Sequence, residues 1–421
     1  MKRLSYIKIV VRGLGVAAAA AAWAQSPSPI TPLYGTTTLI APNEFAVATT
    51  VPTLEKPRAQ YVVVADANDN KDLEVLAWHD TTSSLESISR HGIAEHQGVV
   101  SVAVTGLDVS RVVTADINKE GVLSIDTWRV EPGGVVSQRG YRTAPATASQ
   151  DLSMAAVSCN EVVTAYETTE GNLVVEAWTI GEDGLPAPKA LVGKGSQAFE
   201  ASIAVISPNQ VVTAAADNKQ GLWVSTWEID NAGVKPLHQV ETKNALSPSC
   251  FYGVPRPQSV AVGAGRSSER LTPDFSRPND DLVRSVFTPV LPGCDLQVYY
   301  WGVSQGGLLT LQSNPTLIQA GDVVEVSASM LPGNTPIIFS GGGTGDNHVF
   351  VWGYDGPDFA GNPYNVVNIA SAAAGTDLSN LSLFKPYNAY FITAAQYNPA
   401  GSAADGTLFI NVFSYQEAPM L

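Results

Sequence analysis

The feature that most constrains the fold of this chain is a segment that recurs about every fifty residues. The four clearest copies are YVVVADANDNKDLEVLAW, RVVTADINKEGVLSIDTW, EVVTAYETTEGNLVVEAW and QVVTAAADNKQGLWVSTW, which end at Trp78, Trp128, Trp178 and Trp227. Weaker copies surround Trp301, Trp352 and Phe413. A fixed period of this size indicates repetition of one supersecondary unit. We number the copies unit 1 to unit 7.

Each unit contains four short apolar segments separated by turn residues, and we label these segments strands a to d. In unit 4 they are ASIAVIS, VVTAAA, LWVSTWEI and VKPLHQVE, with Asn, Asp, Gly or Pro at the reversals. The strands lack a clean polar face, which predicts sheets covered on both sides.

This pattern resembles the β-propeller superfamily, which implies an all-β, seven-bladed propeller of four-stranded blades. An open β-repeat array and a pair of β-sandwiches are the alternatives. The signatures of WD40, kelch and sialidase repeats are missing from the sequence, so the resemblance names no functional family.

The two ends of the repeat region favour a closed ring. Unit 7 finishes at its strand c, near Tyr415, whereas residues 33–42 offer a spare strand before unit 1 begins. We expect this N-terminal strand to complete the last blade and leave no open sheet edge. Residues 25–421 are therefore interpreted as a single domain.

Residues 1–24 have the composition of a cleavable signal peptide. Four basic residues precede a short apolar run, and an Ala-Trp-Ala sequence stands before Gln25. The run is too short to span a bilayer. These features predict a secreted or periplasmic protein without a membrane span.

The charge balance narrows the class of partner. Without the signal peptide the chain keeps 20 Lys and Arg against 39 Asp and Glu. Such acidity argues against nucleic acid, which is bound by basic surfaces. An extracellular glycan, peptide or protein is the expected partner, and a monomer the expected state.

Comparison between units separates scaffold from candidate site. The Thr of strand b and the Trp of strand c recur, whereas the acids do not: the position of Asp116 holds Asp66, Tyr166 and Ala215 in other units. We interpret the recurring Trp as wedges between blades and Asp116 as a turn residue. A ring of identical ligand sites is disfavoured, and one composite site is predicted.

Unit 5 departs most from the pattern. Residues 265–294 are predicted to form a long loop between strands b and c, on the same face as glycine-rich b–c loops of units 6 and 7. Long loops on a rigid scaffold often carry function. The candidate ligand-binding residues are Arg266, Arg270, Asp274, Arg277, Asp280, Asp281, Arg284, Asp346 and His348. The arginines could bind a carboxylate or sulfate; alternatively, they pair with the acids of a solvated loop.

Two further groups of residues are expected at the same face. Cys250 and Cys294 are predicted to form a disulfide, leaving Cys159 free. Acids near the starts of strand a could form a funnel for cations or polar ligands at the mouth of the central channel, or could be solvated loop acids. They are Glu44, Asp151, Glu200 and Glu325.

A loop in unit 1 resembles the calcium loops of FG-GAP and integrin-type propellers. In DANDNKDLE, the residues Asp66, Asn68, Asn70 and Glu74 fall on ligand positions. Lys71, however, replaces the turn glycine, so an ordinary hairpin is the alternative. Calcium is possible here, and no other cofactor is expected.

The sequence therefore predicts a secreted binding module with one composite surface over units 5 to 7. It contains no His-Glu-x-x-His, a motif of metal-dependent hydrolases. The alternative is an extracellular hydrolase or lyase that acts on a polysaccharide or ester, with acids assembled from distant units.

Overall fold

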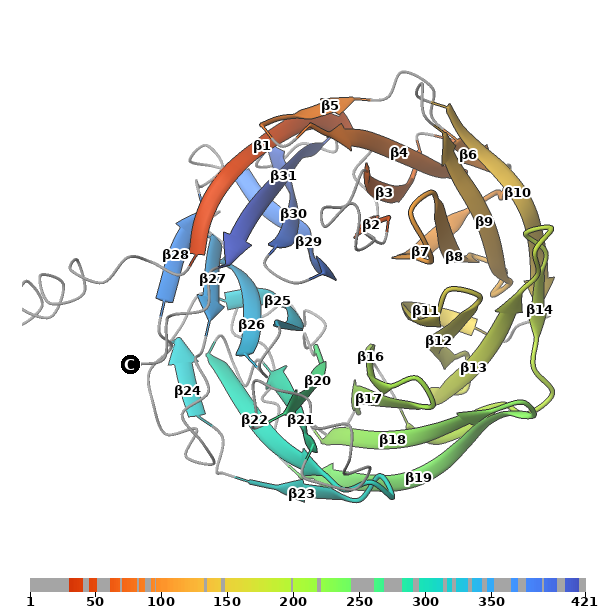
Figure 1. Cartoon of the computed structure of the whole chain (residues 1–421), viewed down its shortest axis with the longest axis vertical. Coiled ribbons are helices and arrows are strands. Elements are labelled where there is room, and N and C mark those ends of the chain that lie inside the picture. The colour runs from red at the N-terminus through yellow and green to blue at the C-terminus, as the bar shows by residue number, and fades with distance from the viewer. Residues whose placement is uncertain are drawn as a thin grey trace, which may run out of the picture.

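The computed structural model describes residues 30–415 with internal gaps, of which the longest are 51–60, 244–260, 269–281 and 352–364. The described residues form antiparallel β-sheets and no helix. Figure 1 shows the sheets standing around a common axis, with the first strand of each nearest to it. The all-β class expected from the sequence is confirmed.

The sheets of units 1 to 4 follow chain order. Unit 1 consists of β2 (Phe45–Thr49), β3 (Tyr61–Ala67), β4 (Leu73–Asp80), β5 (Leu85–Ser87) and β6 (Gly92–Ala94). Unit 2 consists of β7 (Val99–Gly106), β8 (Arg111–Asn118), β9 (Leu123–Glu131) and β10 (Val135–Ala144). Unit 3 consists of β11 (Ala148–Ser158), β12 (Glu161–Thr168), β13 (Asn172–Ile180), β14 (Pro186–Pro188) and β15 (Gly193–Gln197). Unit 4 consists of β16 (Glu200–Ser207), β17 (Gln210–Ala216), β18 (Leu222–Asp230) and β19 (Gly233–Thr242).

Units 5 to 7 continue the series. Unit 5 consists of β20 (Gly263–Ser268), β21 (Leu282–Val290), β22 (Leu296–Val303), β23 (Leu309–Leu311) and β24 (Thr316–Gln319). Unit 6 consists of β25 (Val323–Leu331), β26 (Thr335–Gly342), β27 (Asn347–Val351) and β28 (Asn365–Ile369). The unit 7 sheet has the order β1-β31-β30-β29, from β29 (Thr376–Tyr387), β30 (Tyr390–Pro399), β31 (Gly406–Tyr415) and the N-terminal β1 (Ile30–Ile40).

The spare strand expected at residues 33–42 is observed as β1. It pairs antiparallel with β31, from Ile30 opposite Tyr415 to Ile40 opposite Gly406. One sheet therefore combines both ends of the described chain, as Figure 1 shows for the neighbouring red and dark blue strands.

The core lies between neighbouring sheets. Trp128 packs in one cluster with Val63 and Val75 of unit 1, and Trp178 packs with Ala115 and Ile125 of unit 2. Trp227 and Trp301 repeat the arrangement toward units 3 and 4, and Trp78 packs against unit 7. The interpretation of the recurring Trp as wedges between units is confirmed, and burial of these large rings is a major source of stability.

The recurring Thr of strand b accepts a hydrogen bond from the buried Trp of strand c. Trp128 Nε1 donates to Thr114 Oγ1 at 2.8 Å, and the corresponding bonds to Thr164 and Thr213 measure 3.2 and 2.9 Å. In unit 7, Phe413 occupies the Trp position and has no N–H to donate. The buried Thr393 hydroxyl there has no hydrogen-bond partner.

A second recurring contact joins the strands nearest the axis. Ser101 Oγ of β7 accepts a hydrogen bond from Leu152 N of β11, and Ser153 Oγ accepts one from Ile203 N of β16, both at 3.2 Å. Ser202 does the same for the next unit. The serines that recur on strand a are thus consumed by contacts between units.

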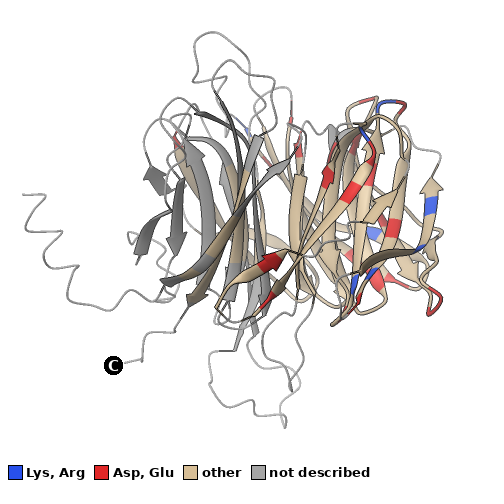
Figure 2. Cartoon of the chain, turned by 90° about the horizontal axis from the view of Figure 1, so that it is seen from above, with Lys and Arg blue, Asp and Glu red and all other residues tan. Residues whose placement is uncertain are grey.

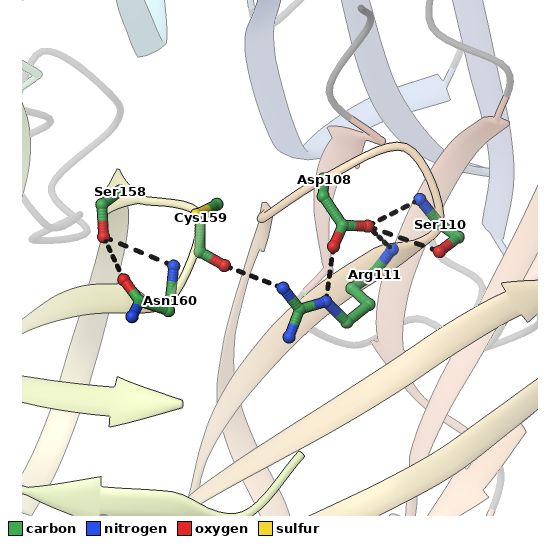
Figure 3. A network of polar contacts seen from close by, with 6 residues as sticks. All are labelled: Asp108, Ser110, Arg111, Ser158, Cys159 and Asn160. Atoms are coloured by element: carbon green, nitrogen blue, oxygen red, sulfur yellow. Dashed lines mark hydrogen bonds and ion pairs between the residues drawn. The ribbon is translucent and has the colours of Figure 1, made fainter. Parts of the chain in front are cut away.

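The a–b turns of units 2 and 3 make a polar contact at one end of the sheets (Figure 3). Arg111 donates to Asp108 at 2.5 Å and to the Cys159 carbonyl oxygen at 3.1 Å. Burial by itself raises the pKa of Asp108, but hydrogen bonds from Ser110 and Arg111 outweigh it and hold this pKa below its usual value. Cys159 is exposed and its thiol is free.

The strand assignment in unit 5 differs from the prediction. Residues 265–294 were expected to be one b–c loop, but Leu282–Val290 forms β21, which pairs with both β20 and β22. The connection at residues 269–281 therefore joins strands a and b. The prediction failed because Arg284 and Pro289 make β21 unlike the apolar strand b of other units.

Candidate functional site

Three polar side chains meet at the boundary between units 1 and 2. Asp116 lies on β8, and Asp126 lies on β9 opposite Thr114. Because strand side chains alternate between faces, these residues share the face of Trp128, which packs against unit 1. His96 reaches them from the connection between β6 and β7.

The three groups are close and buried. His96 Nδ1 lies 2.8 Å from Asp116 Oδ1 and 3.5 Å from Asp126 Oδ2. Both carboxylate side chains have zero exposed area, whereas the His96 side chain is 13% exposed. Three such donor atoms lie within 4.8 Å of one another, close enough to share one metal ion. Solvent reaches the cluster from the histidine side.

The carboxylates have unused bonding capacity. Gln138 Nε2 of β10 donates to Asp126 Oδ1 at 2.5 Å. By contrast, Asp116 Oδ2 and Asp126 Oδ2 are buried and have no hydrogen-bond partner. A buried carboxylate oxygen without a partner is costly, so the arrangement calls for a further positive or protic group.

The electrostatics of the cluster reflect burial and mutual proximity. Burial raises the pKa of Asp116, and burial together with the charge of Asp116 raises the pKa of Asp126 to about 7, against the opposing influence of His96. Burial by itself lowers the pKa of His96. The hydrogen bond to Asp116 and the charges of Asp126, Asp116 and Asp72 outweigh burial, and the pKa of His96 is raised.

The outer rim of the cluster is aromatic and apolar. The rings of His96 and Tyr141 of β10 lie with centroids 6.1 Å apart, and Tyr141 is 59% exposed. Ile93 of β6 is also exposed. General acid–base catalysis requires a hydrogen bond between the catalytic group and the substrate. The two acids are buried, so a polymeric substrate cannot make that contact. The geometry suits binding of a small cation better than catalysis.

The neighbouring unit fills the equivalent positions differently. Fifty residues onward, Tyr166 replaces Asp116 and Glu176 replaces Asp126. Burial raises the pKa of Glu176 to about 7, and a hydrogen bond from Tyr166 opposes the shift. Here a tyrosine hydroxyl that donates a hydrogen bond to Glu176 stands where unit 2 has a second acid, Asp116. The His96 cluster is therefore a departure of one unit.

Sequence reasoning missed this cluster. Asp116 was interpreted as a turn residue, which is wrong: it is a buried strand residue of β8. The turn begins at Asn118, whose side-chain oxygen accepts from Glu120 N and Val122 N. The available signal was strand alternation, since Asp116 is two residues from the buried Thr114.

The residues proposed for calcium do not fit a calcium loop. Asn68 Oδ1 accepts backbone hydrogen bonds from Asn70 at 2.9 Å and Asp72 at 3.0 Å, so it is committed to the turn. Asp66 lies within β3 opposite Glu74 of β4, and Asn70 is exposed. Lys71 holds the turn with φ 64°, where unit 2 has Gly121 at φ 77°. The observed contacts are those of a hairpin.

The residues predicted over units 5 to 7 are divided between two ends of the sheets. Arg266 and Arg284 are paired on β20 and β21, beside the a–b connection. His348 is paired with Ser340 on β27 and β26, beside the b–c connection. Because successive strands are antiparallel, the a–b and b–c connections lie at opposite ends of the sheets, and the single surface over units 5 to 7 stays a prediction. Outside the described residues lie Arg270, Asp274, Arg277, Asp280, Asp281 and Asp346.

The remaining predicted groups are only partly described. Asp151 lies in β11 with φ 58°, and Glu200 begins β16, both in strands nearest the axis. Glu325 lies in β25, but its side chain and the whole of Glu44 fall outside the description. Cys250 and Cys294 also lie outside the described residues, so their disulfide stays a prediction. In the described part, no helix is long and apolar enough to cross a membrane.

No protein-family model and no curated protein matches the sequence. Among solved structures, the chain is similar to Sqt1 from Saccharomyces cerevisiae at 11% identity and a TM-score of 0.47, covering 92% of this chain and 99% of that one.

Two other similar structures are AofleA and SapL1. AofleA from Arthrobotrys oligospora is 11% identical, with a TM-score of 0.45 over 80% of this chain and 90% of that one. The SapL1 lectin, solved with alpha methyl fucoside, is 12% identical, with a TM-score of 0.44 over 79% of this chain and 97% of that one. Similarity at this level carries no argument about the ligand of this chain.

Proposed function

We propose that this protein is a secreted or periplasmic seven-bladed β-propeller that acts as a binding module for an extracellular glycan, peptide or protein. Two observations support the closed ring. β1 and β31 pair in one sheet. Trp78 of unit 1 packs with Ile392 and Ile410 of unit 7, as the other Trp pack against their preceding units.

One observation carries the proposal of a single-site binding module. The polar groups that recur between units, the Thr of strand b and the Ser of strand a, are engaged by Trp side chains and backbone N–H groups of the scaffold. Recognition groups must therefore come from features that differ between units. The buried acids of unit 2 are closed to a polymer, which favours binding over hydrolysis or elimination.

We place the ligand surface at the end that carries the b–c connections. At this end of units 6 and 7 lie the last residues of β26 and β30 and the first residues of β27 and β31. The connection between β6 and β7, which carries His96, lies at the same end, because Lys119 N in the b–c turn of unit 2 donates a hydrogen bond to Gly98 O. Acidic residues outnumber basic ones in the described part (Figure 2), so neutral or cationic ligands are expected.

The first test measures retention of the mature chain on arrays of neutral, cationic and anionic glycans. A second assay incubates the chain with the same glycans and looks for cleaved products. Replacing residues 400–405 by a short turn should abolish retention. The matched control replaces residues 269–281 by a Gly-Ser linker and should retain binding. Binding lost only in the control would place the ligand at the other end, and release of cleaved products would establish the hydrolase or lyase alternative.

A further inference from the structure

We propose that His96, Asp116 and Asp126 form a binding site for one divalent transition-metal ion, with Zn²⁺ as the ion that fits best. The site is distinct from the ligand surface proposed above and does not depend on it. It would connect the segment between β6 and β7 to the sheet of unit 2.

The spacing of the donor atoms supports a metal. In a tetrahedral Zn²⁺ site with bonds of about 2.0 Å, ligand atoms lie roughly 3.3 Å apart. His96 Nδ1 lies 2.8 and 3.5 Å from the nearest oxygens of Asp116 and Asp126. An ion could be accommodated by small shifts of side chains that already point toward one another.

The unsatisfied oxygens are the second, independent observation. Asp116 Oδ2 and Asp126 Oδ2 have no hydrogen-bond partner, and water cannot supply one because both side chains are fully buried. The neutral histidine can serve only one of the two carboxylates as a donor. A divalent cation would compensate both charges.

The surroundings orient the ligands as metal sites require. Gln138 Nε2 holds Asp126 Oδ1, which leaves Oδ2 directed at the histidine. Hydrogen bonds to a ligating carboxylate are typical of metal sites and fix its orientation. Asp72 is close enough for its charge to act on His96 and adds negative potential.

The donor set selects the type of ion. An imidazole nitrogen with two carboxylates suits Zn²⁺ and related transition metals, whereas Ca²⁺ and Mg²⁺ prefer sites made only of oxygen. Three protein ligands leave one position of a tetrahedral ion for water. The competing explanation is a protonated His96 that forms an ion pair with the acids and binds no metal.

Calorimetric titration distinguishes the two. The mature chain, dialysed against a chelator, is titrated with ZnCl₂ and in parallel with CaCl₂ and MgCl₂. We expect one equivalent of Zn²⁺ to bind, with Ca²⁺ and Mg²⁺ at least about 100-fold weaker. His96→Gln and Asp126→Asn should each lower Zn²⁺ affinity at least about 100-fold, and Gln138→Ala about 10-fold to 100-fold.

Matched controls exclude incidental binding. His79→Gln removes an exposed histidine of unit 1, and Glu176→Gln alters the acid at the position equivalent to Asp126; both should leave Zn²⁺ affinity unchanged. If Asp126→Asn fails to fold, His96→Gln decides, because His96 lies on a connecting segment. Absence of Zn²⁺ binding, or binding that survives the ligand variants, would overturn the proposal. Loss of binding in the controls would overturn it equally.

Discussion

The hydrogen bond between Trp128 and Thr114 makes a quantitative test of the wedge. The indole Nε1 donates to the threonine hydroxyl at 2.8 Å, and both side chains are at most 1% exposed. Thr114→Val keeps the shape of the side chain but leaves a buried N–H without an acceptor. We expect this change to lower the free energy of unfolding by about 1–3 kcal/mol.

Trp128→Phe provides the other arm of a double-mutant cycle. It removes the donor and also leaves a gap, so it costs more than the hydrogen bond alone. In the double variant neither group lacks a partner, and the loss should be smaller than the sum of the single losses by about 1–2 kcal/mol. Urea unfolding followed by far-ultraviolet circular dichroism measures all four proteins.

Unit 7 supplies the control from within the chain. Thr393 lies in the unit where Phe413 replaces the Trp of strand c, and its buried hydroxyl already lacks a hydrogen-bond partner. Thr393→Val should therefore be neutral, or stabilising by up to about 1 kcal/mol. Equal losses for Thr393→Val and Thr114→Val, or additive effects in the cycle, would refute the reasoning.

Three further substitutions test other parts of the structure. Lys71→Gly should raise the free energy of unfolding by about 0.5–1 kcal/mol in urea titrations, because φ 64° strains a residue with a side chain; a loss would contradict this. Because the folded pKa of Glu176 is about 7 and its ordinary value 4.5, its protonation stabilises the fold at low pH, and stability should fall by up to about 3 kcal/mol from pH 4.5 to 7. Glu176→Gln should remove this dependence of stability on pH, measured by chemical denaturation at several pH values. An unchanged dependence would show that another group causes it. Ser153→Ala should cost about 1–2 kcal/mol by thermal denaturation, because Ile203 N loses its acceptor across the unit boundary; no change would show that water replaces it.

The repeat made most of the fold predictable. Strand b and strand c of units 1 to 4 carry the same apolar pattern, and the Trp wedge follows from the same comparison. Unit 5 was less predictable, because Arg284 and Pro289 interrupt its strand b and the conformation depends on pairing with both neighbours. Local composition does not report such tertiary pairing.

The candidate site was less visible than the scaffold. His96, Asp116 and Asp126 stand 20 and 10 residues apart, come from a connection and two strands, and match no metal motif. Comparison between units emphasises residues that recur, whereas these three do not. Their meeting depends on the packing of unit 2 against unit 1, which the sequence alone does not report.

The pairing of β1 with β31 has a consequence for how the molecule is assembled. Its partners are roughly 370 residues apart in the chain, the kind of contact that forms late because a long loop must close first. Until then β31 presents a free edge with its apolar residues Leu408, Ile410 and Val412. Aggregation and strand exchange are therefore most favoured during folding, before β1 has paired with β31, when a strand from another molecule could occupy the position of β1.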